Sequence, residues 1–134
     1  MPARPEAASL SVDFSRWPVV LLTYSGHATD GEWTGHLCEI EQRVLARREP
    51  FVHVIDQRRG RPVDSIQRAL IVTHQVRMED RYRRFCRGEV YVANPEMKPV
   101  MTAVFGQARP AYPYAFVDTL DEAMRWASER LNGQ

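Results

Sequence analysis

Ser65 is the side chain whose type and position best suit a chemical modification. It follows Asp64, a favourable N-cap, at the expected start of a helix. A phosphate on the Ser65 hydroxyl would meet unpaired helix amides and the positive end of the helix dipole. Three arginines lie just before this pair and could bind the added charge, namely Arg58, Arg59 and Arg61. The alternative is that Asp64 is only a cap and Ser65 an ordinary residue of the first turn.

The remaining reactive side chains form no pattern that is typical of catalysis or of metal binding. The histidines are not paired at the spacing of a metal site, and His53, inside an apolar run, is most simply a core residue. Cys38 and Cys86 form no CxxC motif and are expected to be free thiols. The sequence contains no glycine-rich phosphate loop, nucleophile elbow or HExxH. We therefore expect no metal, no cofactor and no enzymatic activity.

Composition limits the classes of partner. The chain has 134 residues, of which 44% are hydrophobic and 26% charged, so it is long and apolar enough to fold without a disulfide or a metal. A net charge of +1 disfavours nucleic acid as a partner. The longest apolar run, residues 19–22, is far too short to span a membrane, and residues 1–16 lack the apolar core of a signal peptide. A cytoplasmic protein is the resulting expectation.

Apolar runs predict five strands. Residues 10–14 alternate in polarity like a half-buried strand, and residues 19–24 form a second strand after a turn so short that the two must be antiparallel neighbours. Residues 51–56 lack alternation, which indicates a central strand buried on both faces. The last two strands are expected at 89–93 and 114–117, and residues 57–63 are expected to form a polar loop.

Capping residues predict four helices. T-x-x-E capping boxes begin at Thr29 and Thr119, whereas Asp64 and Asn94 act as N-caps for the other two. The first three helices are expected to end near Arg48, Arg87 and Gly106, and the apolar stripe of the last helix extends to Leu131.

The resulting order, β-β-α-β-α-β-α-β-α, predicts an α/β fold with a mostly parallel five-stranded sheet and an antiparallel edge strand. We expect residues 9–134 to form this single domain. Residues 1–8, which are rich in proline and alanine, are expected to be a disordered N-terminal segment.

This order, together with two stretches, VIDQRRGRPVDS and FVDTLDEAMRWASERL, resembles the STAS domain (sulfate transporter and anti-sigma factor antagonist) and most closely its SpoIIAA-like branch. In that family a central strand ends in aspartate, here Asp56, and an Asp-Ser pair opens the next helix, here Asp64 and Ser65. The serine can be phosphorylated in the antagonists, so the resemblance implies a phospho-switch made of these three residues. It also implies a non-enzymatic bacterial regulatory module that binds a protein partner such as an anti-sigma factor or a kinase.

The second helix carries apolar residues on two faces. Ile66, Ala69, Leu70, Thr73 and Val76 share one face, which we assign to the sheet, because a surface helix needs only one apolar stripe. The opposite face is then a candidate partner or homodimer interface, made of Ile71, Met78, Tyr82 and Phe85. Alternatively, this second stripe packs beneath a loop or a neighbouring helix, and a homodimeric assembly module is a further possible function.

A small-molecule or lipid-binding domain is the remaining alternative, because related branches of the resembling fold are similar to lipid carriers. His27 lies at a strand end, where α/β folds often place ligands. The candidate pocket lining consists of Tyr24, His27, Trp33 and Tyr112.

Overall fold

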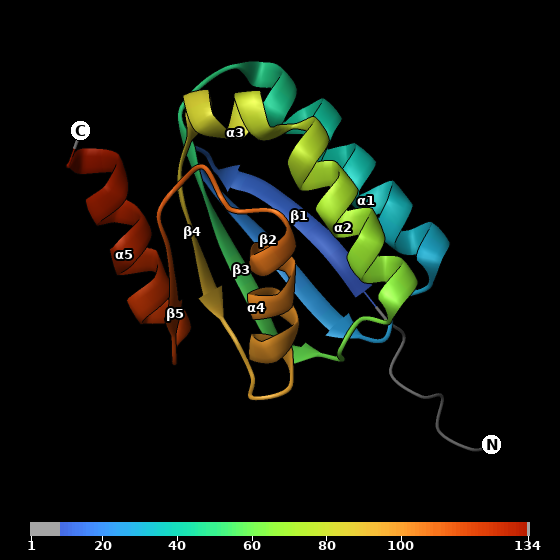
Figure 1. Cartoon of the computed structure of the whole chain (residues 1–134). Coiled ribbons are helices and arrows are strands. Elements are labelled where there is room, and N and C mark those ends of the chain that lie inside the picture. Colours follow the sequence, from blue (N-terminus) through green and yellow to red (C-terminus); the bar gives the residue numbers. More distant parts are fainter. Residues whose placement is uncertain (1–8, 134) are drawn as a thin grey trace.

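The computed structural model describes residues 9–133, so the segment 1–8 that we expected to be disordered lies outside the described residues. These residues form a five-stranded sheet in the chain order β1-β2-β3-β4-β5. β1 pairs antiparallel with β2, and every later pair is parallel (Figure 1). The predicted mixed α/β sheet with an antiparallel edge strand is confirmed.

The strands follow the predicted apolar runs with one important extension. Their bounds are β1 Ser9–Arg16, β2 Val19–Gly26, β3 Phe51–Gly60, β4 Cys86–Val92 and β5 Tyr114–Val117. β3 is the central strand, and its first five residues are all buried, as the missing alternation predicts. It continues to Gly60, however, so the first half of the predicted polar loop is strand.

The first, second and last predicted helices begin directly after their predicted caps, whereas the third begins at Met97, three residues after Asn94, and the second predicted helix is divided in two. The bounds are α1 Asp30–Arg43, a short 3-10 turn at Leu45–Arg47, α2 Ser65–Arg77, α3 Glu79–Phe85, α4 Met97–Gln107 and α5 Leu120–Asn132. Met78 leaves the helical region with φ −100° and ψ 10°, and the acidic Glu79 and Asp80 then begin α3. The predicted continuation to Arg87 was wrong, because β4 already begins at Cys86.

The helices divide unequally between the two faces of the sheet. Each parallel strand is added on the same side of the previous one, and right-handed crossovers therefore place every connecting helix on the same face. α1, α2 and α4 accordingly lie on one side in Figure 1, and α5, which follows the last strand, lies on the other.

Alternate residues of the central strands supply the two hydrophobic layers. Val52 and Val54 of β3, with Val90 and Val92 of β4, pack against Ala123 and Ala127 of α5. The other face of the same strands carries polar as well as apolar side chains, and they lie beneath α1, α2 and α4. His53, Gln57 and Glu89 are in this layer, which makes it the place where a site can form.

Asn94 connects the end of β3 to the start of α4. Its Nδ2 donates to the carbonyl oxygens of Gln57 at 3.0 Å and Gly60 at 2.9 Å. Its Oδ1 accepts from the backbone N–H groups of Glu96 at 2.9 Å and Met97 at 2.8 Å. The predicted capping role of Asn94 is therefore present, and the same side chain also fixes the extension of β3 that holds Gln57.

Candidate functional site

Ser65 lies on the surface at the start of α2, where the hydrogen bonds of its neighbours fix the backbone. It is the first residue of α2 and is exposed, and Asp64 Oδ1 accepts from the backbone N–H of Gln67 at 2.8 Å. The Gln67 side chain does not complete a capping box. Its Nε2 donates instead to the Ala28 carbonyl at 2.8 Å and to Asp30 Oδ1 at 3.0 Å, which fastens the start of α2 to the start of α1.

A groove between α1 and α2 begins at this serine. Its volume is about 590 Å³, and its lining consists of Thr34, Leu37, Cys38 and Glu41 from α1 with Ser65, Ile66, Ala69, Leu70, Thr73, His74 and Arg77 from α2. Ile66 is 60% exposed, an unusually open position for a large aliphatic side chain. The groove is therefore an apolar trough with a hydroxyl at one end.

The far end of the groove is charged. Glu41 Oε2 accepts from His74 Nδ1 at 2.7 Å and also pairs with Arg77. Burial opposes ionisation of Glu41, but its hydrogen bonds and charge interactions with His74 and Arg77 outweigh this effect and lower its pKa. Burial lowers the pKa of His74 despite the adjacent carboxylate. His74 Nε2 lies 2.7 Å from the hydroxyl of Tyr82, which continues the network into the core.

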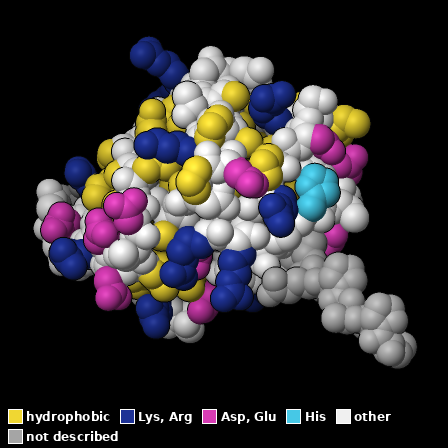
Figure 2. Space-filling view, turned by 90° about the horizontal axis from the view of Figure 1, so that it is seen from below, with side chains coloured by type: hydrophobic (Ala, Val, Ile, Leu, Met, Phe, Trp, Pro, Cys, Tyr) yellow, Lys and Arg dark blue, Asp and Glu magenta, His cyan; other side chains and the backbone are white. Residues whose placement is uncertain are grey.

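The arginines before Ser65 already have acidic partners. Arg58 contacts Asp56 through two bonds, Nε to Oδ1 at 2.9 Å and one terminal nitrogen to Oδ2 at 2.8 Å. This pair lowers the pKa of Asp56 and raises that of Arg58. Arg61 lies 3.7 Å from Glu96, and Arg59 also has an interaction. Figure 2 shows Lys and Arg beside acidic side chains at this end of the molecule rather than a uniformly basic surface.

The assignment of the two faces of the second helix was wrong. Ile71 and Tyr82 are buried, at 7% and 2% exposure, and Met78 and Phe85 are half-buried against the same core. The outward face carries Ile66 and Val76 instead, each 60% exposed. The apolar periodicity predicted the wrong buried face because that face also contains two polar residues, Gln67 and His74. Both are buried because they form hydrogen bonds with residues of α1 and its N-terminal loop. Ile71, Met78, Tyr82 and Phe85 are thus core residues rather than an exposed interface.

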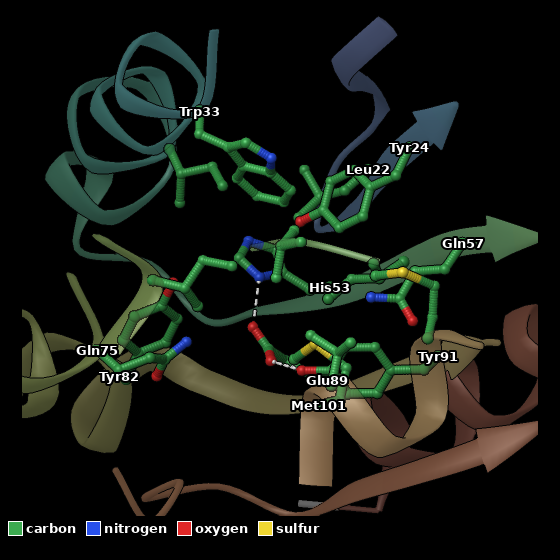
Figure 3. A pocket seen from close by; sticks show the side chains of 16 residues that line it. Leu22, Tyr24, Trp33, His53, Gln57, Gln75, Tyr82, Glu89, Tyr91 and Met101 are labelled. Atoms are coloured by element: carbon green, nitrogen blue, oxygen red, sulfur yellow. Dashed lines mark hydrogen bonds and ion pairs between the residues drawn. The ribbon is translucent and has the colours of Figure 1, made fainter. Parts of the chain in front are cut away.

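A second candidate site lies inside the molecule, between the sheet and the helices α1, α2 and α4 (Figure 3). Its centre is a pair of direct neighbours in the β3–β4 ladder, His53 and Glu89. His53 Nδ1 donates to Glu89 Oε2 at 2.8 Å, and both side chains are buried. Glu89 Oε1 accepts from the hydroxyl of Tyr112 at 2.7 Å and from that of Tyr91.

The three donors keep Glu89 ionised in the interior. Burial alone would raise the pKa of this carboxyl, but the hydrogen bonds that it accepts from His53, Tyr91 and Tyr112 lower it. Burial beside Glu89 raises the pKa of the three tyrosines Tyr82, Tyr91 and Tyr112, so they stay protonated and can donate.

The cavity beside this pair has a volume of about 40 Å³, enough for a small number of water molecules. Its walls include Leu22, Tyr24, Trp33, Ile55, Gln57, Tyr82, Met97 and Met101. Among the described residues, neither His53 Nε2 nor either polar atom of the Gln57 side chain has a hydrogen-bond partner. Such atoms typically cost ~1–3 kcal/mol each when they are buried unpaired, so three of them around one cavity call for an explanation.

The predicted pocket residues are only partly brought together. Tyr24 and Trp33 line the cavity, with ring centroids 5.2 Å apart and an edge-to-face geometry. Tyr112 reaches the site through its bond to Glu89, whereas His27 is exposed and does not line the cavity. Sequence analysis missed Glu89 and Gln57. A glutamate inside the apolar run EVYV was the available signal for the first, and the placement of Gln57 in a loop hid the second.

Within residues 9–133, no three or more His, Cys, Asp and Glu side chains gather as a metal site would require. No helix in this part of the chain is long and apolar enough to cross a bilayer.

Two solved structures share this architecture. An uncharacterised protein of the DUF3478 family with a SpoIIAA-like fold from Shewanella loihica superimposes with a TM-score of 0.66 and 12% identity, over 95% of this chain and 98% of that chain. An anti-sigma factor antagonist from Mycobacterium paratuberculosis gives 0.58 and 17%, over 92% and 97%. No protein-family model and no curated protein matches the sequence. The chain therefore has the SpoIIAA-like fold that its motifs predict.

Proposed function

We propose that this chain is a non-enzymatic regulatory module that binds a helix of a partner protein in the groove between α1 and α2. The observation that carries the proposal is the position of Ser65 and the exposed Ile66 side by side at the rim of one apolar groove. The likeness of the fold to an anti-sigma factor antagonist supports a role of this kind. We place the module in the cytoplasm as part of the same proposal.

The shape of the groove favours a helical partner. Ile66, Ala69 and Thr73 follow each other at spacings of three and four along α2, with Leu70 beside them, and Leu37 lines the groove from α1. A partner helix that lays its apolar side into such a groove buries surface that water now covers. The ion pairs of Glu41 close the far end and would favour a polar residue there.

Phosphorylation of Ser65 would act on this surface by charge. A phosphoserine carries about −1.5 to −2 charges at neutral pH. Asp64 and Asp30 already lie at the same end of the groove, so the new charge would repel an acidic partner. It would also oppose docking of an apolar partner, because the phosphate would lose its hydration. Arg68, one turn further along α2, is the cation whose spacing suits the phosphate, since Arg58 and Arg61 pair with carboxylates. We therefore propose that modification weakens docking rather than creating it.

The chain offers a matched pair of variants for the test. Ile66 and Val76 are equally exposed on the same helix, but only Ile66 lines the groove. Tagged wild type, Ile66→Asp and Val76→Asp are used to recover partners from cells of the source organism, and recovery is quantified by mass spectrometry. We expect one partner to be lost with Ile66→Asp and kept with Val76→Asp.

The switch is tested with the same partner. Ser65→Ala should bind like wild type, and Ser65→Asp should bind more weakly. If the partner binds all four variants equally, the groove is not its docking site. If the partner binds Ile66→Asp more weakly than wild type but binds Ser65→Asp equally well, only the phospho-switch is refuted. Light scattering tests the homodimer: a wild-type dimer that Ile66→Asp dissociates would identify a second copy as the occupant.

A further inference from the structure

The interior cavity is lined by unpaired polar atoms that lower the stability of the fold and that its packing does not require. Gln57 is fully buried on the central strand, and neither its amide nitrogen nor its amide oxygen has a partner within residues 9–133. Two other positions on the same face of β3, Phe51 and Ile55, are apolar. A methionine would have the same length as Gln57 and no polar atoms to leave unpaired, so packing alone does not account for the amide.

His53 adds a third buried polar atom without a partner among the described residues, its ring nitrogen Nε2. Because Nδ1 faces the ionised Glu89, the ring proton lies on that nitrogen, and Nε2 presents a lone pair. Nε2 is buried and has no partner among the described residues. In Figure 3 the bonded nitrogen faces Glu89, and the other side of the ring faces Trp33 and Tyr24. The cavity therefore offers one acceptor at His53, and a donor and an acceptor at Gln57.

The spacing of these groups defines the length of an occupant. His53 and Gln57 lie four residues apart on one strand, so their Cα atoms are roughly 13 Å apart, and the side chain between them on this face is Ile55. A molecule that contacts both ends must be polar at each end and apolar in the middle. Tyr24 and Trp33 provide an aromatic wall for a flat ring.

The opposite wall can adapt. Met97, Val100 and Met101 of α4 line the cavity, and methionine side chains change rotamer at low cost. The present volume of about 40 Å³ fits water rather than a ring, so binding requires these side chains to move outward. An added charge would be desolvated here, which favours a neutral molecule.

We infer that this cavity is a binding site for a small, flat, uncharged aromatic molecule with a hydroxyl or N–H donor for His53 at one end and a carboxamide-type group for Gln57 at the other. The inference is independent of the groove, because it uses none of the residues that line the proposed docking surface.

The probe for the test is 4-hydroxybenzamide, titrated into ¹⁵N-labelled protein and followed through the indole N–H resonance of Trp33. We expect saturable shifts in wild type and in Met101→Leu, which keeps the volume of the wall. Gln57→Met should lose two hydrogen bonds and bind about tenfold more weakly or worse. The same substitution should raise the midpoint of thermal unfolding without the probe, because it removes two unpaired polar atoms. 4-Hydroxybenzoate, which carries a charge, should bind more weakly than the amide.

Three results would overturn the inference. Wild type could show no saturable shift with 4-hydroxybenzamide, or Gln57→Met could bind the probe as well as wild type. Gln57→Met could also lower the unfolding midpoint, which would mean that the amide has a structural role in holding internal water. Each of these results leaves the groove between α1 and α2 untouched, so the two proposals fail separately.

Discussion

His53 and Glu89 face each other across the β3–β4 ladder, and His53 Nδ1 lies 2.8 Å from Glu89 Oε2 in the buried core. A buried hydrogen bond between a histidine and a carboxylate stabilises little relative to an apolar pair, but removing one partner is costly because a charge or a donor is left unpaired.

Replacing Glu89 by Gln should therefore destabilise the fold strongly. The amide keeps the size of the side chain but loses the charge that His53, Tyr91 and Tyr112 all contact. We expect a loss of about 3 kcal/mol in the free energy of unfolding, measured by urea denaturation. The double variant His53→Leu with Glu89→Met should lose less than the sum of the single variants. Strict additivity would mean that the two groups are not coupled.

His36 should make stability depend on pH between pH 6.5 and 4. Both ring nitrogens are buried without a partner within the described chain, and burial lowers the pKa to about 4. As the pH falls through ~6.5, the unfolded chain takes up a proton that the folded chain refuses, so stability falls. The full effect is roughly 3 kcal/mol. Burial also lowers the pKa of His74, which contributes in the same direction.

Replacement of His36 by Phe tests this linkage. The ring sits edge-on to Tyr24 and Trp33, a setting that suits phenylalanine equally well. We expect the variant to be more stable than wild type at pH 5 and to lose less stability between pH 7 and pH 5. His27→Asn, on an exposed loop, serves as the control for removing one histidine. An unchanged slope in His36→Phe would show that His36 is protonated in the folded chain.

Gly88 should not tolerate a side chain, because α5 packs directly against it. A Cβ atom there would lie 2.5 Å from Cη2 of Trp126 and 3.1 Å from the Pro113 carbonyl oxygen. We expect Gly88→Ala to cost about 1–3 kcal/mol in denaturant unfolding. Gly35→Ala is the matched control, since nothing lies within 4 Å of its Cβ position in α1. That variant should gain about 0.5–1 kcal/mol, and an equal loss in both would contradict the steric explanation.

Tyr82 should act through the core rather than through an interface. Its hydroxyl donates to His74 Nε2 at 2.7 Å, so Tyr82→Phe leaves that nitrogen unpaired and should cost about 1–2 kcal/mol. Glu at position 82 should unfold the chain, because it buries an unpaired charge. If Tyr82→Glu stayed folded and only changed the oligomeric state, the interface hypothesis for this residue would have to be restored.

The predictable part of the fold is the part that local sequence controls. Apolar runs located every strand, and the capping box at Thr29 is present in full, with Glu32 N donating to Thr29 Oγ1 and Thr29 N donating to Glu32 Oε1. The break at Met78 was not predictable in this way, because the apolar pattern continues through it. The orientation of α2 failed for a related reason: hydrogen bonds to residues more than thirty positions away allow Gln67 and His74 to be buried.

The two candidate sites also differ in how far local sequence could predict them. Ser65 and its cap were visible as a motif, because they are neighbours in sequence. The cavity is lined by β2, β3, β4 and the four helices α1 to α4, and its polar atoms come from residues that form no motif in the sequence. Only the strand register, which pairs His53 with Glu89, shows that the histidine of one apolar run meets the glutamate of another.

α5 lies C-terminal to all five strands and, among the helices of residues 9–133, is the one that covers the face carrying Val52, Val54, Val90 and Val92. During synthesis the whole sheet can be complete while this strip of valines still faces water. The interval before residues 120–132 emerge and dock is therefore when the nascent protein is most prone to self-association, and a chaperone that shields one flat apolar side would be most useful then.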